Sequence, residues 1–296
     1  MTEAPGRHLP VMAGEVLTLL GAAPGMLLVD LTVGGGGHAE AFLRATAPTG
    51  TVIGCDRDSS ALDVARARLA DDAERVRLLH GDSVSVLARL HAEGVRAHAV
   101  LLDLGLSSMQ LDDAERGFSL REDGPLDMRM DKSTGATAAE FLNTASEDAI
   151  VRALAEGGDE PQAERIARAI VARRAERPLH TTGDLRTLVE AALGRRYGRV
   201  HPATRCFQGV RGVVNRELEL LEQALPMALD LLRPAGRLGV ISFHSGEDRI
   251  VKRVFAEAAS GGHALVTRKP CVPDRAEAAR NRRSRSARLR VVRRRS

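Results

Sequence analysis

The chain has 296 residues, with 44% hydrophobic and 28% charged residues and a formal net charge of +4. This composition excludes wholesale disorder, and the length fits one large domain or a domain that carries an insertion. The three cysteines, Cys55, Cys206 and Cys271, are single and far apart, which excludes a disulfide framework and a structural zinc site. We therefore predict no metal. The first residues lack the apolar run of a signal peptide and no stretch is long enough to span a membrane, so we expect a cytoplasmic protein.

Strand and helix patterns alternate through the first 103 residues. Short apolar runs predict four strands, at 27–30, 51–56, 76–80 and 99–103. The segments that separate these runs predict three helices, at 38–45, 60–69 and 84–90. Strands that alternate with helices at this spacing indicate a parallel, doubly wound α/β sheet.

The alternation stops after residue 105 and resumes near residue 212. Between these points the pattern predicts a polar segment and then helices, at 137–142, 147–154, 162–174 and 182–193. The remaining pattern predicts helices at 215–232 and 247–258 and a turn at 233–236. It predicts strands at 237–243, 264–267 and 289–292. We therefore predict a discontinuous domain of residues 1–105 and 213–296, interrupted by a helical domain of residues 106–212.

Positive charge is concentrated in two segments. Residues 268–296 hold 12 Lys or Arg against two acids, a local charge of +10, and residues 162–216 hold 12 Arg against four acids. Such clusters suit a phosphate backbone, because bound cations release condensed counterions. The alternative is a solvated tail and a solvated helix surface. Aromatic residues make up 2% of the chain, so broad base stacking is not the main device for binding nucleic acid.

Acidic residues and a glycine run follow the predicted strands. Glycines 34–37 come after the first strand and open a helix, where backbone N–H groups can approach a ligand, although a simple turn would also tolerate them. Asp30, Asp56 and Asp103 end strands one, two and four, and Asp82 follows strand three. Each acid alone could be a helix cap, but four at consecutive strand ends predict a ligand site at the carboxyl edge of the sheet, with Asp56 placed for a ribose diol.

Two cofactor classes fit this edge of the sheet. A nicotinamide enzyme would hold a pyrophosphate on the glycines, whereas S-adenosylmethionine has no phosphate there. Asp30 lies four residues before the first glycine, and its charge would repel a pyrophosphate. The residues therefore favour S-adenosylmethionine, with a nicotinamide dehydrogenase as the rival.

Several longer motifs resemble one known family. Residues 103–120 read DLGLSSMQLDDAERGFSL, and residues 241–253 read ISFHSGEDRIVKR. Further matching blocks lie at residues 8–12, 30–38, 125–130, 201–205, 214–218 and 281–290. In order and from end to end, these blocks resemble the bacterial 16S rRNA (cytosine-N4)-methyltransferase family, known as RsmH or MraW.

The resemblance implies a class I, Rossmann-like methyltransferase domain that uses S-adenosyl-L-methionine and is interrupted by a helical substrate-recognition domain. It implies cofactor contacts by Gly36, Gly37, His38, Asp56, Ser83, Asp103 and Gln110. Ser83 stands where the family usually has an aromatic residue near the adenine. Asp103 is our candidate catalytic residue, as an acceptor for the hydrogens of the target amine. The implied partner is 16S rRNA in the small ribosomal subunit, and the alternative is a non-catalytic RNA-binding ribosome assembly factor on the same fold.

Overall fold

The computed structural model describes residues 10–194 and 201–296. The motif at residues 8–12 and the arginine-rich segment 162–216 therefore each lie partly outside the described residues. The chain divides into two compact units. The first comprises Met1–Gly105 and Leu220–Ser296, and the second comprises Leu106–Glu219.

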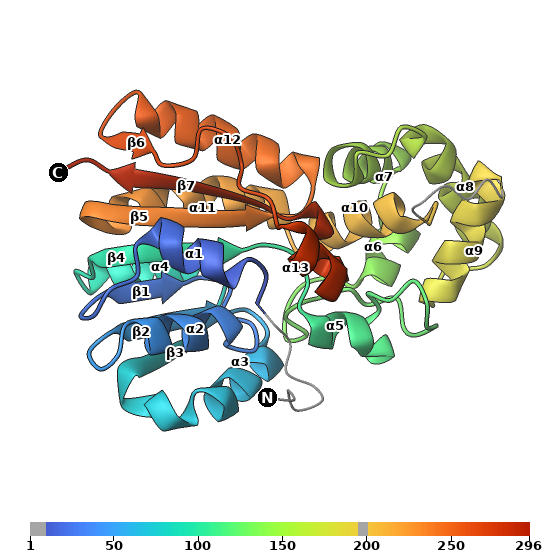
Figure 1. Ribbon diagram of the computed structural model, residues 1–296. Helices are drawn as coiled ribbons and strands as arrows, with labels where there is room; N and C mark the ends of the chain where they lie inside the picture. Colours follow the sequence, from blue (N-terminus) through green and yellow to red (C-terminus); the bar gives the residue numbers. More distant parts are fainter. Residues whose placement is uncertain (1–9, 195–200) are drawn as a thin grey trace. The chain divides into compact units, whose positions relative to one another are not determined.

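The first unit is built on a seven-stranded sheet with the order β3-β2-β1-β4-β5-β7-β6 (Figure 1). Its strands are β1 Leu27–Asp30, β2 Thr51–Asp56, β3 Val76–His80, β4 Ala97–Asp103, β5 Leu232–Ser242, β6 His263–Leu265 and β7 Arg288–Arg294. Strands β1 to β5 are parallel, and β7 runs antiparallel to both β5 and β6. The predicted parallel α/β sheet is confirmed, with β7 as its antiparallel member.

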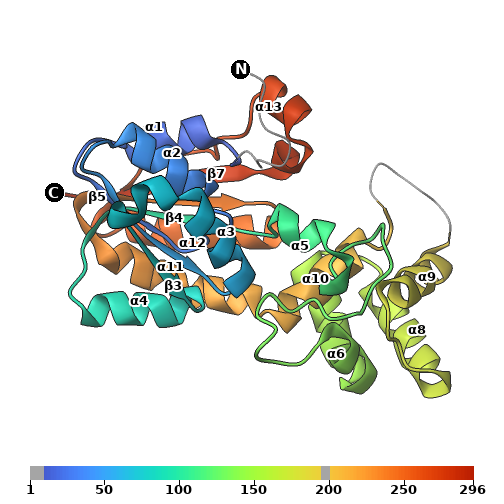
Figure 2. The same ribbon diagram turned by 90° about the horizontal axis from the view of Figure 1, so that it is seen from below.

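Helices cover both faces of this sheet, which explains why the strands β1, β2 and β4 consist mostly of buried apolar residues. Leu28 and Val29 are both fully buried, but they belong to different clusters on opposite faces. Figure 2 shows α1, α2 and α3 over one face and α4, α11 and α12 over the other. The helical segments are α1 Ala13–Leu20, α2 Gly37–Ala45, α3 Ser59–Arg68, η1 Ala70–Arg75, α4 Ser83–Ala92, α11 Glu217–Leu231, α12 Ser245–Ala259, α13 Arg275–Arg280 and η4 Arg282–Ser286.

The second unit is helical and has a separate hydrophobic core. Its segments are α5 Ser108–Asp112, η2 Ala114–Arg116, α6 Ala138–Thr144, α7 Glu147–Arg152, the π-helical turn η3 Ala153–Gly157, α8 Ala163–Glu176, α9 Thr182–Leu193 and α10 Thr204–Val214. The polar segment before Met130 is held by buried side chains. Asn215 donates to the Met128 carbonyl at 2.7 Å and accepts from the Met130 N–H at 2.8 Å.

Four of the α-helices that the structure describes were not predicted from the sequence: α1, α5, α10 and α13. In α10 the reason is visible, because Gly209 and the valines near its end have low helix propensity. A Cβ at Gly209 would lie 2.5 Å from the Ala153 carbonyl oxygen, so this glycine allows two helical segments to approach closely. The predicted turn at 233–236 lies inside β5 as an irregularity in its pairing with β4. None of the helices within residues 10–194 and 201–296 has the length and apolar character needed to cross a membrane.

Candidate active site

Three acids meet at the carboxyl edge of the sheet in the first unit. β2, β1 and β4 are neighbours, and they end in Asp56, Asp30 and Asp103. Because parallel strands end at one edge, the topology brings these three carboxylates to the same side of the sheet, where open α/β sheets bind ligands.

The glycine loop crosses this edge between β1 and α2. Gly34 and Gly36 have φ values of 51° and 80°, a backbone conformation that favours glycine. Gly36 precedes α2 without a capping side chain, so the first N–H groups of that helix are open to a ligand. A Cβ on Gly37 would lie 3.2 Å from Pro10 Cβ and 3.3 Å from Arg68 Nη1. The loop therefore depends on glycine for both its shape and its packing.

Asp56 ties the glycine loop to the end of β2. Its two carboxylate oxygens accept the backbone N–H groups of Gly34 and Asp58, each at 2.9 Å. Burial raises the pKa of Asp56, although these hydrogen bonds oppose the shift. Each oxygen retains a second lone pair that can accept a ribose hydroxyl. The contact of Asp56 with a ribose stays a prediction.

Asp30 is a buried carboxyl group with one unused oxygen. Its side chain is 1% exposed, and Oδ1 accepts the Thr32 N–H at 3.2 Å. Within the described part of the chain, Oδ2 has no hydrogen-bond partner. Burial raises the pKa of Asp30 to about 7, against the opposing effects of the nearby His38 and the Thr32 hydrogen bond. A buried carboxylate without a partner is costly, and this site therefore suits a cationic ligand group.

His38 and Asp103 form the centre of the site. His38 Nε2 lies 3.4 Å from Asp103 Oδ2, and His38 is 7% exposed. Burial alone would lower the pKa of His38, but its contact with Asp103 and the charges of Asp103 and Asp30 raise it overall. The Asp103 N–H also donates to Thr32 Oγ1 at 2.6 Å. No described residue donates to Asp103 Oδ1, which leaves one oriented acceptor atom.

Asp82 is a helix cap, one of the roles that the sequence left open for it. Its Oδ1 accepts the N–H groups of Val84 at 2.9 Å and Ser85 at 3.0 Å at the start of α4. Burial would raise the pKa of Asp82, but these hydrogen bonds outweigh it and the pKa is lowered. Ser83 is the first residue of the same helix. Its contact with the cofactor stays a prediction.

Gln110 belongs to the second unit, where it caps α5. Its Oε1 accepts the Ser107 N–H at 3.1 Å, and its own N–H donates to Ser107 Oγ at 3.2 Å. Gln110 is a buried residue. Its cofactor contact is likewise a prediction.

The structure adds two residues that the sequence did not single out. Thr32 receives the Asp103 N–H, as described above, and it lies inside the motif at residues 30–38. Arg68 on α3 donates to the Gly35 carbonyl at 3.2 Å, and its Nε lies 3.1 Å from Glu40 Oε2 on α2. Nothing in the local sequence distinguishes Arg68 from a surface arginine, because its partners are about thirty residues away.

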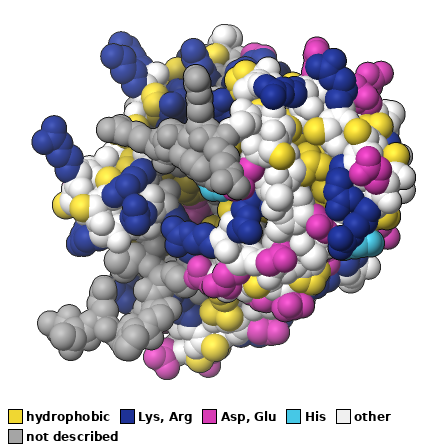
Figure 3. All heavy atoms as spheres, turned by 90° about the vertical axis from the view of Figure 1, so that its right-hand side faces the viewer, with side chains coloured by type: hydrophobic (Ala, Val, Ile, Leu, Met, Phe, Trp, Pro, Cys, Tyr) yellow, Lys and Arg dark blue, Asp and Glu magenta, His cyan; other side chains and the backbone are white. Residues whose placement is uncertain are grey.

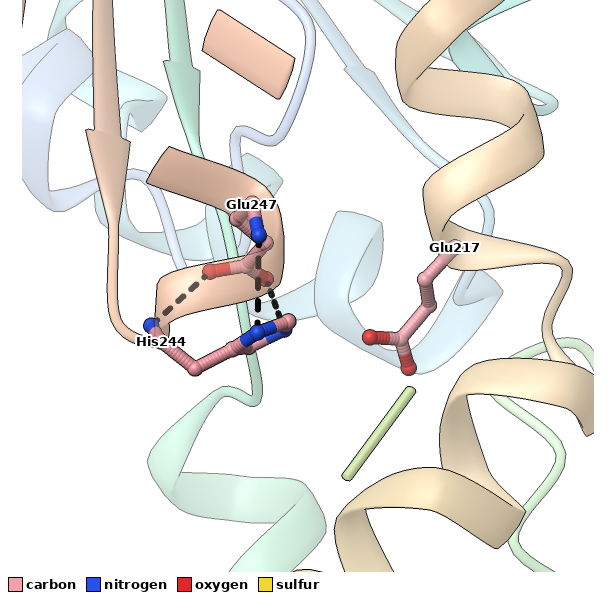
Figure 4. Close-up of side chains that lie close together, drawn as sticks. All are labelled: Glu217, His244 and Glu247. Atoms are coloured by element: carbon pink, nitrogen blue, oxygen red, sulfur yellow. Dashed lines mark hydrogen bonds and ion pairs between the residues drawn. The ribbon is translucent and has the colours of Figure 1, made fainter. Parts of the chain in front are cut away.

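The end of β5 is held by a capping box at the start of α12 (Figure 4). Glu247 accepts the N–H groups of Phe243 at 2.8 Å and His244 at 3.3 Å. His244 Nδ1 accepts the Glu247 N–H at 3.4 Å, and His244 Nε2 lies 3.2 Å from Glu247 Oε1. His244 therefore has a structural role at the rim of the sheet.

Comparison with known proteins gives the same assignment along the whole chain. The MraW methylase family matches residues 6–295. A protein of Syntrophotalea carbinolica named ribosomal RNA small subunit methyltransferase H is 47% identical, with 99% of this chain and 100% of that protein covered. A protein of the same name from Heliobacterium mobile is 46% identical, with 96% and 98% covered.

Among solved structures, an rRNA methylase from Streptococcus thermophilus is 12% identical with a TM-score of 0.47, covering 98% of this chain and 100% of that one. The sheet order and the family match confirm the predicted class I, Rossmann-like methyltransferase fold. The nicotinamide dehydrogenase, the rival that the sequence left open, is not supported. This chain belongs to the MraW methylase family and is a methyltransferase.

Proposed function

We propose that this enzyme methylates the exocyclic N4 of a cytidine in the decoding region of 16S rRNA, within the small ribosomal subunit. The observation that carries the proposal is the arrangement of Asp30, Asp103 and the glycine loop. Two buried carboxylate oxygens, Asp30 Oδ2 and Asp103 Oδ1, have no donor among the described residues, and both belong to strands at the loop.

The donor side of the site fits S-adenosyl-L-methionine. When bound, this cofactor supplies an electrophilic methyl group on a positively charged sulfur. The open N–H groups of α2 suit its carboxylate, the free oxygen of Asp30 suits its ammonium group, and Asp56 suits its ribose. The residues that we assign to the cofactor are Gly36, Gly37, His38, Asp56, Ser83, Asp103 and Gln110.

Asp103 is the residue that we assign to the acceptor side. The lone pair of an exocyclic cytosine amine is delocalised into the ring, so the enzyme must orient the amine and accept its hydrogens. His38 Nε2 lies 3.4 Å from Oδ2 of Asp103, and Oδ1 remains as an acceptor for an N–H of the amine. Rate enhancement then comes from alignment and from a fixed negative charge near the amine as it becomes positive.

The RNA contacts that we propose involve the segment 275–285, which includes α13 and η4. Glu277 on α13 accepts the Met12 N–H at 2.6 Å, and its charge helps to raise the pKa of His38, so α13 lies near the cofactor loop. Arg275, Arg280 and Arg282 are exposed and form no hydrogen bond or ion pair with any residue that the structure describes. These side chains are therefore available for phosphates.

We assign substrate recognition to the second unit as well, through its arginine-rich helices. Figure 3 shows Lys and Arg side chains spread over one face of the molecule, with acidic side chains between them. Such a surface favours recognition of a folded RNA shape over tight binding of any single strand. Small ribosomal subunits are cytoplasmic, and we place the reaction there.

A non-catalytic RNA-binding factor explains the site less well. Leaving two buried carboxylate oxygens without hydrogen bonds destabilises the fold, and a protein that only binds RNA gains nothing from them. An enzyme requires them for its cofactor and for the target amine.

The proposal is tested by methyl transfer to three substrates at equal concentration. Labelled S-adenosylmethionine is incubated with small subunits lacking the modification, with free 16S rRNA and with a short oligonucleotide bearing the target cytidine. We expect efficient methylation of the subunits, poor methylation of the oligonucleotide, and N4-methylcytidine in nucleoside mass analysis. Methylation at carbon 5 would contradict the proposed chemistry, and equal rates on subunit and oligonucleotide would contradict the proposed recognition.

A further inference from the structure

Phe243 is the one aromatic residue described in the first unit that is not fully buried. This unit contains three aromatic residues, and two of them, Phe42 and Phe255, are buried with at most 2% of their surface exposed. Phe243 is partly exposed, although its ring also packs against the cluster that contains Phe42. In a chain with 2% aromatic residues, an aromatic surface at the edge of the sheet requires an explanation.

The position of Phe243 places it beside Asp103. Asp103 pairs with Ile241 in the parallel β4–β5 ladder, and the Leu104 N–H donates to the Ile241 carbonyl at 3.0 Å. Phe243 follows the end of β5 directly. A Cβ on Gly105 would lie 3.3 Å from Phe243 Cδ2, so the ring lies against the backbone two residues beyond Asp103. Gly105 has a φ of 100°, which favours glycine here.

The backbone of Phe243 is held rigidly. Its N–H donates to Glu247, which is buried inside the capping box of α12. The next residue of α12, Asp248, accepts hydrogen bonds at 2.7 and 3.0 Å from Arg290 on β7. The ring therefore has the fixed support that a binding surface needs.

We propose that the ring of Phe243 is the surface on which the target cytosine stacks while Asp103 holds its amine. This inference rests on the proposed function. A base that is methylated on its exocyclic amine must leave its stack, and it then requires an apolar or aromatic surface in the enzyme. Of the residues described in the first unit, Phe243 alone offers a partly exposed aromatic ring close to Asp103 in the strand register.

The test compares variants that keep or remove the ring. Phe243→Leu and Phe243→Met remove it but keep an apolar side chain, and Phe243→Tyr keeps it. Phe255→Leu is the matched control, because it removes a buried ring from the other face of the sheet. For each variant we would measure kcat/KM on small subunits, the Kd for S-adenosylmethionine by calorimetry, and the Tm.

We expect the Leu and Met variants to lose roughly tenfold to hundredfold in kcat/KM on subunits, the range for removing one aromatic–base stack. Their cofactor Kd should stay within about twofold of wild type, since the ring acts on the base. The Tyr variant should recover most of the activity. The Phe255→Leu control should lower Tm and leave kcat/KM nearly unchanged.

Two results would overturn the stacking role. One is a folded Leu or Met variant with wild-type kcat/KM. The other is a loss of cofactor affinity as large as the loss of kcat/KM, which would assign the ring to the cofactor pocket. The product of the wild-type enzyme separates this inference from the proposed function. If that product is not N4-methylcytidine, the proposed function fails. If the wild-type product is N4-methylcytidine and the folded Leu variant keeps wild-type kcat/KM, only the role of Phe243 fails.

Discussion

Asp30 should make the stability of the cofactor-free protein depend on pH. Replacing Asp30 with Asn should remove most of that dependence. Burial raises the pKa of Asp30 from 3.8 to about 7. At a pH between these two values, the folded protein therefore keeps a proton on Asp30 that the unfolded chain has lost. A shift of about three units corresponds to about 4 kcal/mol. This is an upper bound, because Asn at position 30 also removes a charge that raises the pKa of His38.

The direction of the effect follows from the raised pKa. Below about pH 4 the carboxyl group is protonated in both states and contributes its full stability. As the pH rises through about 7, that contribution is lost, because the folded protein must then hold a buried charge. Asn stays neutral throughout, so Asp30→Asn should gain on wild type by up to about 4 kcal/mol between about pH 4 and pH 8.

Urea unfolding of both proteins, at unit intervals across this range and at constant ionic strength, measures the difference. The part of the difference in unfolding free energy that is the same at every pH reflects how well the amide of Asn fits the site, and it is not part of the prediction. A difference in unfolding free energy that stays constant from about pH 4 to pH 8 would refute the reasoning about Asp30. The same variant should bind S-adenosylmethionine more weakly, since its ammonium group loses a charged acceptor.

Three further outcomes follow from the contacts. Asp56→Ala should weaken S-adenosylmethionine binding by about tenfold or more in calorimetry, because charge-assisted hydrogen bonds are each worth roughly 1.5–3 kcal/mol; Asp63→Ala, at an exposed position, is the control. Asp248→Asn should cost about 3–5 kcal/mol in urea unfolding, since it leaves the buried Arg290 without a charged partner. Burial alone would raise the pKa of Asp248, but its bonds to Arg290 and Arg288 lower it overall, so wild type should lose this stability as the pH falls below about 4. The third outcome concerns a variant in which four arginines are replaced with Gln, which removes their charges: Arg280, Arg282, Arg283 and Arg285. RNA binding of this variant should weaken and its salt slope should fall by roughly 0.7–0.9 per lost phosphate contact, whereas an unchanged slope would show that this segment does not touch phosphate.

Much of the fold could be predicted because its signals are local. The runs that became β1, β2 and β4 are mostly apolar and buried, and this pattern depends only on burial from both faces of the sheet. Parallel strands joined by helices must end at one edge, so Asp30, Asp56 and Asp103 meet there once the strands are identified. The motifs along the chain then indicated the family and the cofactor. These conclusions required no knowledge of distant contacts.

The tertiary structure alone decided which groups have partners. Asp82 and Gln110 are each bonded as helix caps, whereas Asp30 and Asp103 each keep one carboxylate oxygen free, and their sequence contexts do not distinguish these outcomes. The link from Arg68 to the glycine loop and the place of β7 between β5 and β6 join residues far apart in the chain. Hydrogen-bond partners and burial are properties of packed neighbours, and local propensity and spacing do not contain them.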